Sequence, residues 1–145
     1  MRGKQADLQR LVHIVKWCFK LQVVGSDAQT YENFISRKNY RLVELSAFYI
    51  GQIGEHVRNL SDEMKNIISD IPWRQINDMR NILIHNYGKI RKEVVWSVIT
   101  EHAPILSKKC LEVLRAENSN VDAELREELA EETDIFDGEQ ANDNR

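Results

Sequence analysis

One short segment of the chain carries an arginine, a histidine and a tyrosine among aliphatic side chains: residues 80–87, RNILIHNY. An arginine guanidinium stays charged and presents a planar fork of donors that matches phosphate oxygens. A histidine imidazole, with an unperturbed pKa of about 6.5, takes up or releases a proton near neutral pH. Arg80 and His85 are therefore residue types that can bind an oxyanion and transfer a proton.

Each of the three residues also has a purely structural interpretation. Arg80 can extend its charge beyond the edge of a core. His85 suits the C-terminal end of a helix, where the helix dipole favours a cation. Tyr87 alone would be an aromatic side chain at the edge of a core.

Apolar residues recur at helical spacing along most of the chain, with no alternating strand pattern and no hairpin signal. This predicts an all-α fold, an antiparallel bundle of four to five helices. The main helices are expected at 5–24, 28–37, 40–60, 72–87 and 91–116. Gly25 and Gly88 are expected to end the first and fourth helices, and Pro104 is expected to kink the last.

Two smaller signals refine this outline. Ser61, followed by two acidic residues, is a helix cap for a short segment that ends near Ser69. Gly51 and Gly54 lie three apart in the helix expected at 40–60, where each costs about 1 kcal/mol relative to alanine. We expect another helix to approach closely there, in the core or across a subunit interface.

The charge is divided unevenly along the 145 residues, which suffice for one domain. Residues 117–145 hold 11 acidic and 2 basic residues, a net charge of −9. Residues 1–116 hold the remaining 18 basic and 12 acidic residues, a net charge of +6. We predict a helical domain over 1–116 and a mobile acidic tail over 117–145. The basic body favours a polyanionic partner, although a plain solubilising tail would give the same asymmetry.

Composition also bears on compartment and metal binding. The two cysteines, Cys18 and Cys110, lie in helical apolar patterns, and we expect two buried free thiols rather than a disulfide. The chain has no apolar run of membrane-spanning length, and its N-terminus does not resemble a signal peptide, so we expect a cytoplasmic protein with no membrane partner. No metal-ligand spacing is present, and we expect neither a metal nor another cofactor. The remaining histidines are scattered and interpreted as structural or exposed: His13, His56 and His102.

Residues 80–87 acquire a more specific meaning together with their surroundings. The arginine, the polar residue after it, and His-x-Tyr resemble the R-x4-H-x-Y motif of the HEPN superfamily. The segments QIGEHV (52–57), IPWRQINDMRNILIHNY (71–87) and EVVWSVI (93–99) are similar to one branch, the HepT-like toxins. The resemblance covers about residues 5–115, and it implies a HEPN-like helical domain that acts as a toxin of a toxin–antitoxin system.

The resemblance implies a metal-independent endoribonuclease that cleaves transfer or messenger RNA. Arg80 and His85 would be the catalytic residues, because cleavage needs proton transfer and stabilisation of the charge that develops on the phosphate. Asn81, four residues before His85, would hold the imidazole, and Asp78 lies on the same side of the predicted helix.

The predicted helix 72–87 places Arg80 and His85 about 140° apart, so one helix cannot easily aim both at the same phosphate. Two helices related by a two-fold axis could do so. The resemblance also implies a site in a cleft between two protomers, and we therefore expect a homodimer. Nearby basic residues are expected to bind flanking phosphates of the RNA, although each could equally be a solvated surface charge: Arg74, Lys89, Arg91 and Lys92.

The resemblance further implies a partner, an MntA-like minimal nucleotidyltransferase antitoxin that transfers AMP to Tyr87. A bulky, negatively charged phosphodiester on this tyrosine could pair with Arg80 and occupy the space that RNA needs. The acidic tail could fold over the basic groove or contact the antitoxin. The alternative is a non-catalytic HEPN subunit that binds and positions a nucleotidyltransferase or its substrate. A helical dimer with no nucleic-acid role is a further possibility.

Overall fold

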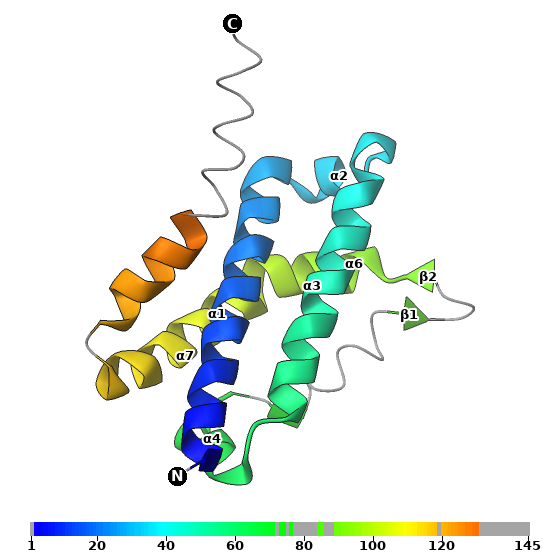
Figure 1. The fold of residues 1–145 in the computed structure, drawn as a ribbon. Coiled ribbons are helices and arrows are strands. Elements are labelled where there is room, and N and C mark those ends of the chain that lie inside the picture. The colour runs from blue at the N-terminus through cyan, green and yellow to red at the C-terminus, as the bar shows by residue number, and fades with distance from the viewer. Residues whose placement is uncertain are drawn as a thin grey trace, which may run out of the picture.

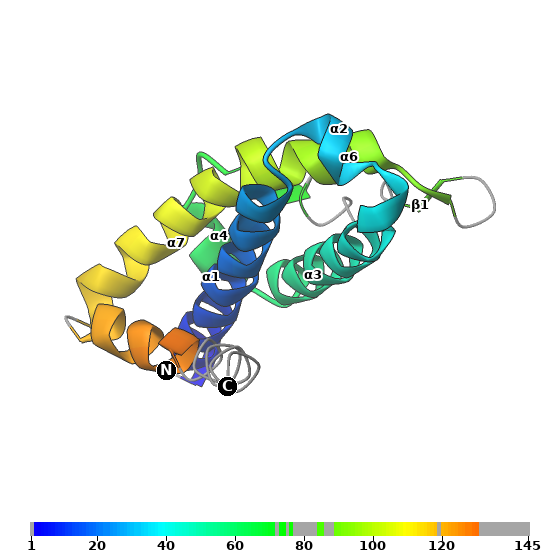
Figure 2. The same cartoon turned by 90° about the horizontal axis from the view of Figure 1, so that it is seen from above.

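The computed structural model describes residues 2–71, 73, 74, 76, 84, 85, 89–118 and 120–130. Two long helices, α1 (Arg2–Ala28) and α3 (Tyr40–Arg58), lie side by side and antiparallel (Figure 1). A third long element crosses behind both of them (Figures 1 and 2). It consists of α6 (Lys92–Ser97), the π-helical turn η2 (Val98–His102) and α7 (Ala103–Glu117). The prediction of an all-α bundle is confirmed.

Shorter elements connect the long helices. The helix α2 (Tyr31–Phe34) and the 3-10 turn η1 (Arg37–Asn39) join α1 to α3, and α4 (Asp62–Ile67) follows α3. The Ser61 hydroxyl caps α4 by accepting a hydrogen bond from the backbone N–H of Met64 at 3.1 Å. This cap was predicted from the sequence and is confirmed.

The core lies where α1 packs against α3 and α7. Its fully buried side chains include Leu11, Ile14 and Leu21 of α1 and Val57 of α3. Both cysteines are buried and free, as predicted. Burial raises the pKa of the Cys110 thiol to about 12. Burial, together with the nearby Cys110, also raises the pKa of the Cys18 thiol well above its ordinary value.

A buried carboxylate joins the start of α1 to the start of α4. The side chain of Asp7 is only 5% exposed. Its Oδ1 accepts a hydrogen bond from the backbone N–H of Ser61 at 3.0 Å, and its Oδ2 accepts one from the Ser61 hydroxyl at 2.5 Å. The hydroxyl that caps α4 is therefore itself held in place by a charged group on another helix.

The first helix continues past Gly25, where the sequence predicted its end. It ends instead at Ala28, and the backbone of the next residue, Gln29, adopts the left-handed region with φ of 68°. Gly25 lies against η2, and a Cβ at this position would lie 2.8 Å from Cγ2 of Ile99. The close approach expected at Gly51 is not found among the described residues, since a Cβ there would meet nothing within 4 Å. Gly54 is buried.

The acidic segment also differs from the mobile tail that we expected. Residues 121–130 form a helix that lies beside α1 (orange in Figure 1), with Val121 and Leu125 buried in the core. Arg115 of α7 forms a two-pronged ion pair with Asp122 at 3.0–3.1 Å. Lys16 of α1 lies 3.3 Å from Glu128, so buried apolar side chains and ion pairs together dock this part of the acidic sequence. Residues 131–145 lie outside the described residues, and the division at 116 stays a prediction.

No helix within the described residues combines the length and the apolar character that spanning a membrane requires.

Candidate active site

The residues just before 77–83 are held against the core of the protein. Ile71, Trp73 and Ile76 are all buried in the core. The indole N–H of Trp73 donates to the backbone carbonyls of Lys65 at 3.0 Å and Ile68 at 2.8 Å. Trp73 therefore connects the turn that contains it to the end of α4.

An ion pair adds a second anchor on the same side. Lys109 of α7 lies 2.8 Å from the carboxylate of Asp70, in the turn just before Ile71. The hydrogen bond from Lys109 is the main reason that the pKa of Asp70 is lowered. Because the Asp70 carboxylate is exposed to water, which screens the attraction, this ion pair contributes little to stability. Burial of the three apolar residues is thus the stronger anchor.

The chain leaves the motif through a short antiparallel strand pair, β1 (Ile84–His85) and β2 (Lys89–Ile90). Ile84 is the register partner of Ile90, and His85 is the register partner of Lys89. Ile90 is half-buried and packs against the core. The backbone at His85 is therefore fixed by pairing with a strand whose other residue contacts the body of the protein.

This strand pair corrects the helix expected at 72–87. Residues 73, 74 and 76 are helical, but Ile84 and His85 are extended. The angle of about 140° between Arg80 and His85 assumed a continuous helix, so it no longer describes their relation. The β-branched residues Ile82 and Ile84 suit a strand as well as a buried helix, and apolar spacing alone does not separate the two in a short run.

Several predicted site residues lie outside the described residues. Among them are the catalytic arginine, both supporting residues and the tyrosine expected to be modified: Asp78, Arg80, Asn81 and Tyr87. For His85 the structure gives the backbone position in β1. What the structure establishes is therefore the pair of anchors on either side of residues 77–83, rather than the catalytic arrangement itself.

The four basic residues expected to bind RNA are all described. Arg74 and Lys89 are exposed. Arg91 is exposed, but its Nε lies 3.2 Å from a carboxylate oxygen of Glu93. The Lys92 ammonium lies 5.8 Å from the ring centroid of Tyr40, at the start of α3. Lys89 is the one that lies in direct register with His85.

The other histidines form no site with the motif in the described part of the chain. His13 of α1 and His56 of α3 stack, with ring centroids 5.0 Å apart and planes inclined by 9°. Partial burial, then the neighbouring His13 and Arg10, lower the pKa of His56, while Glu55 raises it. His102 is exposed in η2. Within the described residues, no three His, Cys, Asp or Glu side chains are placed to hold a metal ion.

The fold and the anchored segment define a small all-α protein with an R-x4-H-x-Y motif between two fixed points. The family model of HepT-like ribonucleases matches residues 8–113. The chain therefore belongs to the HepT-like family, as the sequence resemblance predicted.

Individual relatives agree with this membership. A protein of Caldanaerobacter subterraneus subsp. tengcongensis, provisionally named an RNase, is 32% identical over 107 residues, which is 74% of this chain and 93% of that protein. A Thermococcus cleftensis protein, provisionally named ribonuclease HepT, is 33% identical over 79 residues, or 54% of this chain and 70% of its own. No solved structure is significantly similar to this chain. The family and these relatives support a ribonuclease as the class of activity.

Proposed function

We propose that this chain is a metal-independent endoribonuclease in which Arg80 and His85 perform the chemistry. The observation that carries the proposal is the unbroken R-x4-H-x-Y motif in a member of the HepT-like family. The reaction needs the ribose 2′-oxygen to attack the adjacent phosphorus while the bond to the 5′-oxygen breaks. His85 would take the 2′-hydroxyl proton or protonate the leaving 5′-oxygen, and Arg80 would bind the non-bridging oxygens. The products are a 2′,3′-cyclic phosphate end and a 5′-hydroxyl end.

The test is cleavage of single-stranded RNA in the presence of EDTA. We expect cleavage by the parent protein and none by His85→Ala or Arg80→Ala. His102→Ala and Arg37→Ala are matched controls, because both residues are exposed and lie outside the motif. Cleavage that persists in both motif variants would refute the site assignment. Cleavage that appears only after a divalent metal is added would refute metal independence.

The active form is proposed to be a homodimer with a composite site between protomers. The helical-wheel argument no longer supports this, because His85 lies in β1. The family resemblance does support it. An apolar surface on α3 is also available to a second copy, since Phe48 is 55% and Leu45 is 41% exposed.

Subunit complementation tests the composite site directly. Suppose that Arg80 of one protomer acts with His85 of the other. A heterodimer of one Arg80→Ala protomer and one His85→Ala protomer then contains one intact site. An equal mixture that exchanges subunits freely would then recover about a quarter of the parent activity. No recovery, in a mixture shown by mass spectrometry to contain heterodimers, would place both groups in the same protomer.

The proposed regulator is an MntA-like nucleotidyltransferase antitoxin that AMPylates Tyr87. In that reaction the tyrosine oxygen would attack the α-phosphorus of ATP, pyrophosphate would leave, and the phenolic proton would pass to a base. The added anion would compete with RNA for Arg80. Coexpression followed by peptide mass spectrometry should find AMP on Tyr87 and none after Tyr87→Phe. Modification of another residue in the parent protein would contradict this assignment.

The flanking basic residues are proposed to bind RNA phosphates. Lys89 is the best candidate, because it is exposed and is the register partner of His85. The ion pair with Glu93 makes Arg91 a weaker candidate, although this pair is exposed to water and therefore weak. Lys89→Ala should weaken binding of all RNA sequences and reduce the slope of log K against log salt by about 0.7. An unchanged slope would remove Lys89 from the interface.

The competing function is a non-catalytic subunit that binds a nucleotidyltransferase or positions its substrate. It shares the fold and the family with the nuclease proposal. A parent protein that binds the nucleotidyltransferase tightly but cleaves no RNA would favour this alternative. Growth arrest on expression, lost with His85→Ala and relieved by the nucleotidyltransferase, would favour the cytoplasmic toxin.

A further inference from the structure

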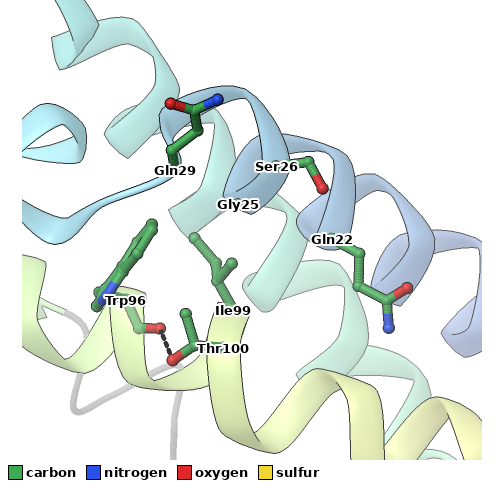
Figure 3. A pocket seen from close by; sticks show the side chains of 7 residues that line it. All are labelled: Gln22, Gly25, Ser26, Gln29, Trp96, Ile99 and Thr100. Atoms are coloured by element: carbon green, nitrogen blue, oxygen red, sulfur yellow. Dashed lines mark hydrogen bonds between the residues drawn. The ribbon is translucent and has the colours of Figure 1, made fainter.

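A hollow of about 580 Å³ lies between the last turns of α1 and the α6–η2 segment, open to solvent (Figure 3). Its size is within the range of small-ligand sites. Trp96, Ile99 and Thr100 lie on one side of it and the last turns of α1 on the other, with the amides of Gln22 and Gln29 at its two ends (Figure 3). The residues that line it are Gln22, Gly25, Ser26, Gln29, Trp96, Ile99 and Thr100.

The absence of a side chain at Gly25 allows α1 to pack directly against Ile99 at the base of this hollow. A Cβ at this position would lie 2.8 Å from Cγ2 of Ile99, which is closer than real side chains approach. The missing side chain lets α1 and η2 come together at their base. Gln22 and Ser26, one turn apart on α1, then form one wall.

Gln29 stands at the rim with a strained backbone. Its φ of 68° is a conformation that glycine adopts freely and that costs other residues about 1–2 kcal/mol. Its N–H closes the end of α1 by donating to the carbonyl of Gly25 at 2.8 Å. This backbone role needs no side chain, and glycine would fill it at lower cost. The glutamine side chain at this position is therefore the feature that calls for a functional explanation.

The opposite wall is aromatic. Trp96 is half-buried, and Phe34 of α2 packs against it with ring centroids 5.0 Å apart. The Thr100 hydroxyl donates to the backbone carbonyl of Trp96 at 2.9 Å, which leaves its oxygen free to accept. The side chains of Gln22, Ser26 and Gln29 form no hydrogen bond with any other described residue. The hollow thus combines a flat aromatic side with amide groups whose donors and acceptors are available.

We propose that this hollow binds an unpaired base of an RNA strand, a proposal that rests on the ribonuclease function proposed above. Proteins recognise single-stranded RNA by stacking a splayed base on an aromatic side chain and hydrogen-bonding its edge. Glutamine amides suit that edge, because they donate and accept side by side. No Lys or Arg lines the hollow, so its chemistry fits a base rather than a phosphate. A base bound in the hollow would give the protein a preference among RNA sequences, which contacts to phosphates alone do not provide.

The hollow is close enough to the motif for one strand to reach both. Three residues lead from Lys89 to Lys92 at the start of α6, and four helical residues lead from there to Trp96. The Cα atoms of Lys89 and Trp96 are therefore no more than about 17 Å apart. Pairing across β1 and β2 adds about 5 Å to reach His85. A few nucleotides can span that distance.

The test measures binding of fluorescein-labelled single-stranded oligoribonucleotides by anisotropy, in a His85→Ala background that prevents cleavage. Gln29→Gly removes the rim amide and relieves the backbone, so it should bind about tenfold more weakly while its melting temperature stays equal or rises. Gln22→Ala should also weaken binding. Gln9→Ala is the matched control, since Gln9 is an exposed glutamine on the same helix outside the hollow, and it should bind like the parent.

Salt dependence separates a base site from a phosphate site. The ratio of affinities between the parent and Gln29→Gly should stay constant from low to high salt, because losing a neutral contact releases no counterions. The proposal is overturned if Gln29→Gly and Gln22→Ala bind every oligonucleotide as the parent does. It is also overturned if the weakening disappears at high salt.

The two proposals can fail separately. If the protein with His85 intact cleaves RNA but the glutamine variants bind normally, the nuclease stands and the base site falls. If no RNA is cleaved but the variants lose affinity while Gln9→Ala does not, the base site stands and the nuclease falls.

Discussion

Removal of the Asp7 carboxylate should be among the most damaging single changes on the α1–α4 contact. Asp7→Ala deletes two hydrogen bonds to a charged acceptor and leaves the backbone N–H of Ser61 without its partner. Hydrogen bonds to charged groups contribute about 1.5–3 kcal/mol, and an unpaired buried donor costs about 1–3 kcal/mol. Allowing for overlap, we expect a loss of about 3 kcal/mol in the free energy of unfolding. At about 3 °C per kcal/mol, the melting temperature should fall by about 9 °C.

Three further variants show whether the hydrogen bonds cause this loss. Asp7→Asn keeps an acceptor for the backbone N–H and nearly the same volume, so it should cost only about 1 kcal/mol. Ser61→Ala removes the cap of α4 and leaves one Asp7 oxygen unpaired, for about 2–3 kcal/mol. Since both changes remove the same hydrogen bond, Asp7→Ala/Ser61→Ala should cost at least about 1 kcal/mol less than the sum of the single variants.

Urea unfolding followed by circular dichroism measures the stability of the parent and of all four variants. Two results would refute the reasoning: equal stability for Asp7→Ala and Asp7→Asn, or strict additivity in the double variant. Either would mean that Asp7 acts through general packing at the start of α1 rather than through the Ser61 cap.

Three other predictions concern glycine, histidine and cysteine residues. Gly25→Ala should destabilise by about 1 kcal/mol, because overpacking against η2 outweighs the gain in helix propensity, whereas Gly51→Ala should stabilise by about 1 kcal/mol, with thermal melts as the measurement. The lowered pKa of His56 means that the folded state binds fewer protons there than the unfolded state. Stability should therefore fall as pH drops below about 6.5 toward the folded pKa, and His56→Gln should flatten that fall in urea titrations from pH 5 to 7. The thiols of Cys18 and Cys110 should resist iodoacetamide at pH 8 in the native protein and react fully in urea, since burial raises the pKa of both. For Cys110 a pKa of about 12 leaves about one thiol in ten thousand ionised at that pH. Rapid labelling of the native protein would contradict their burial.

Local signals in the sequence predicted much of the fold. The helix expected at 40–60 is α3 at Tyr40–Arg58, and the Ser61 cap begins α4 as expected. Both follow from interactions within a few residues, which the sequence states directly. Pro104 occurs at the first turn of α7, and the residues before it, Val98–His102, form a π-helical turn, so the helix geometry changes where the sequence predicted a kink.

The errors arose where contact or pairing with another segment of the chain decides the local structure. Gly25 resembles a helix stop, but its role comes from Ile99, more than 70 residues away in sequence. The strand at Ile84 and His85 depends on pairing with Lys89 and Ile90, which apolar spacing did not reveal.

The candidate site was recognised from the identity and order of its residues, not from derived geometry. The R-x4-H-x-Y pattern led to the family, and the family match supports that recognition. The hollow beside Trp96 was not anticipated, because its parts come from two segments of the chain. Its one local signal is the polar run at the end of α1, where Gln22, Ser26 and Gln29 share a face.

The strand pair β1–β2 makes the spacing between His85 and Lys89 a fixed dimension of the protein. Side chains alternate faces along a strand, so inserting or deleting one residue among 86–88 would shift the pairing by one position. Ile90, which packs against the core, would then turn outward or pull α6 out of place. Related chains with functional motifs should therefore keep the tyrosine at position 87 and the number of residues between His85 and Lys89, while the amino acids at positions 86 and 88 vary.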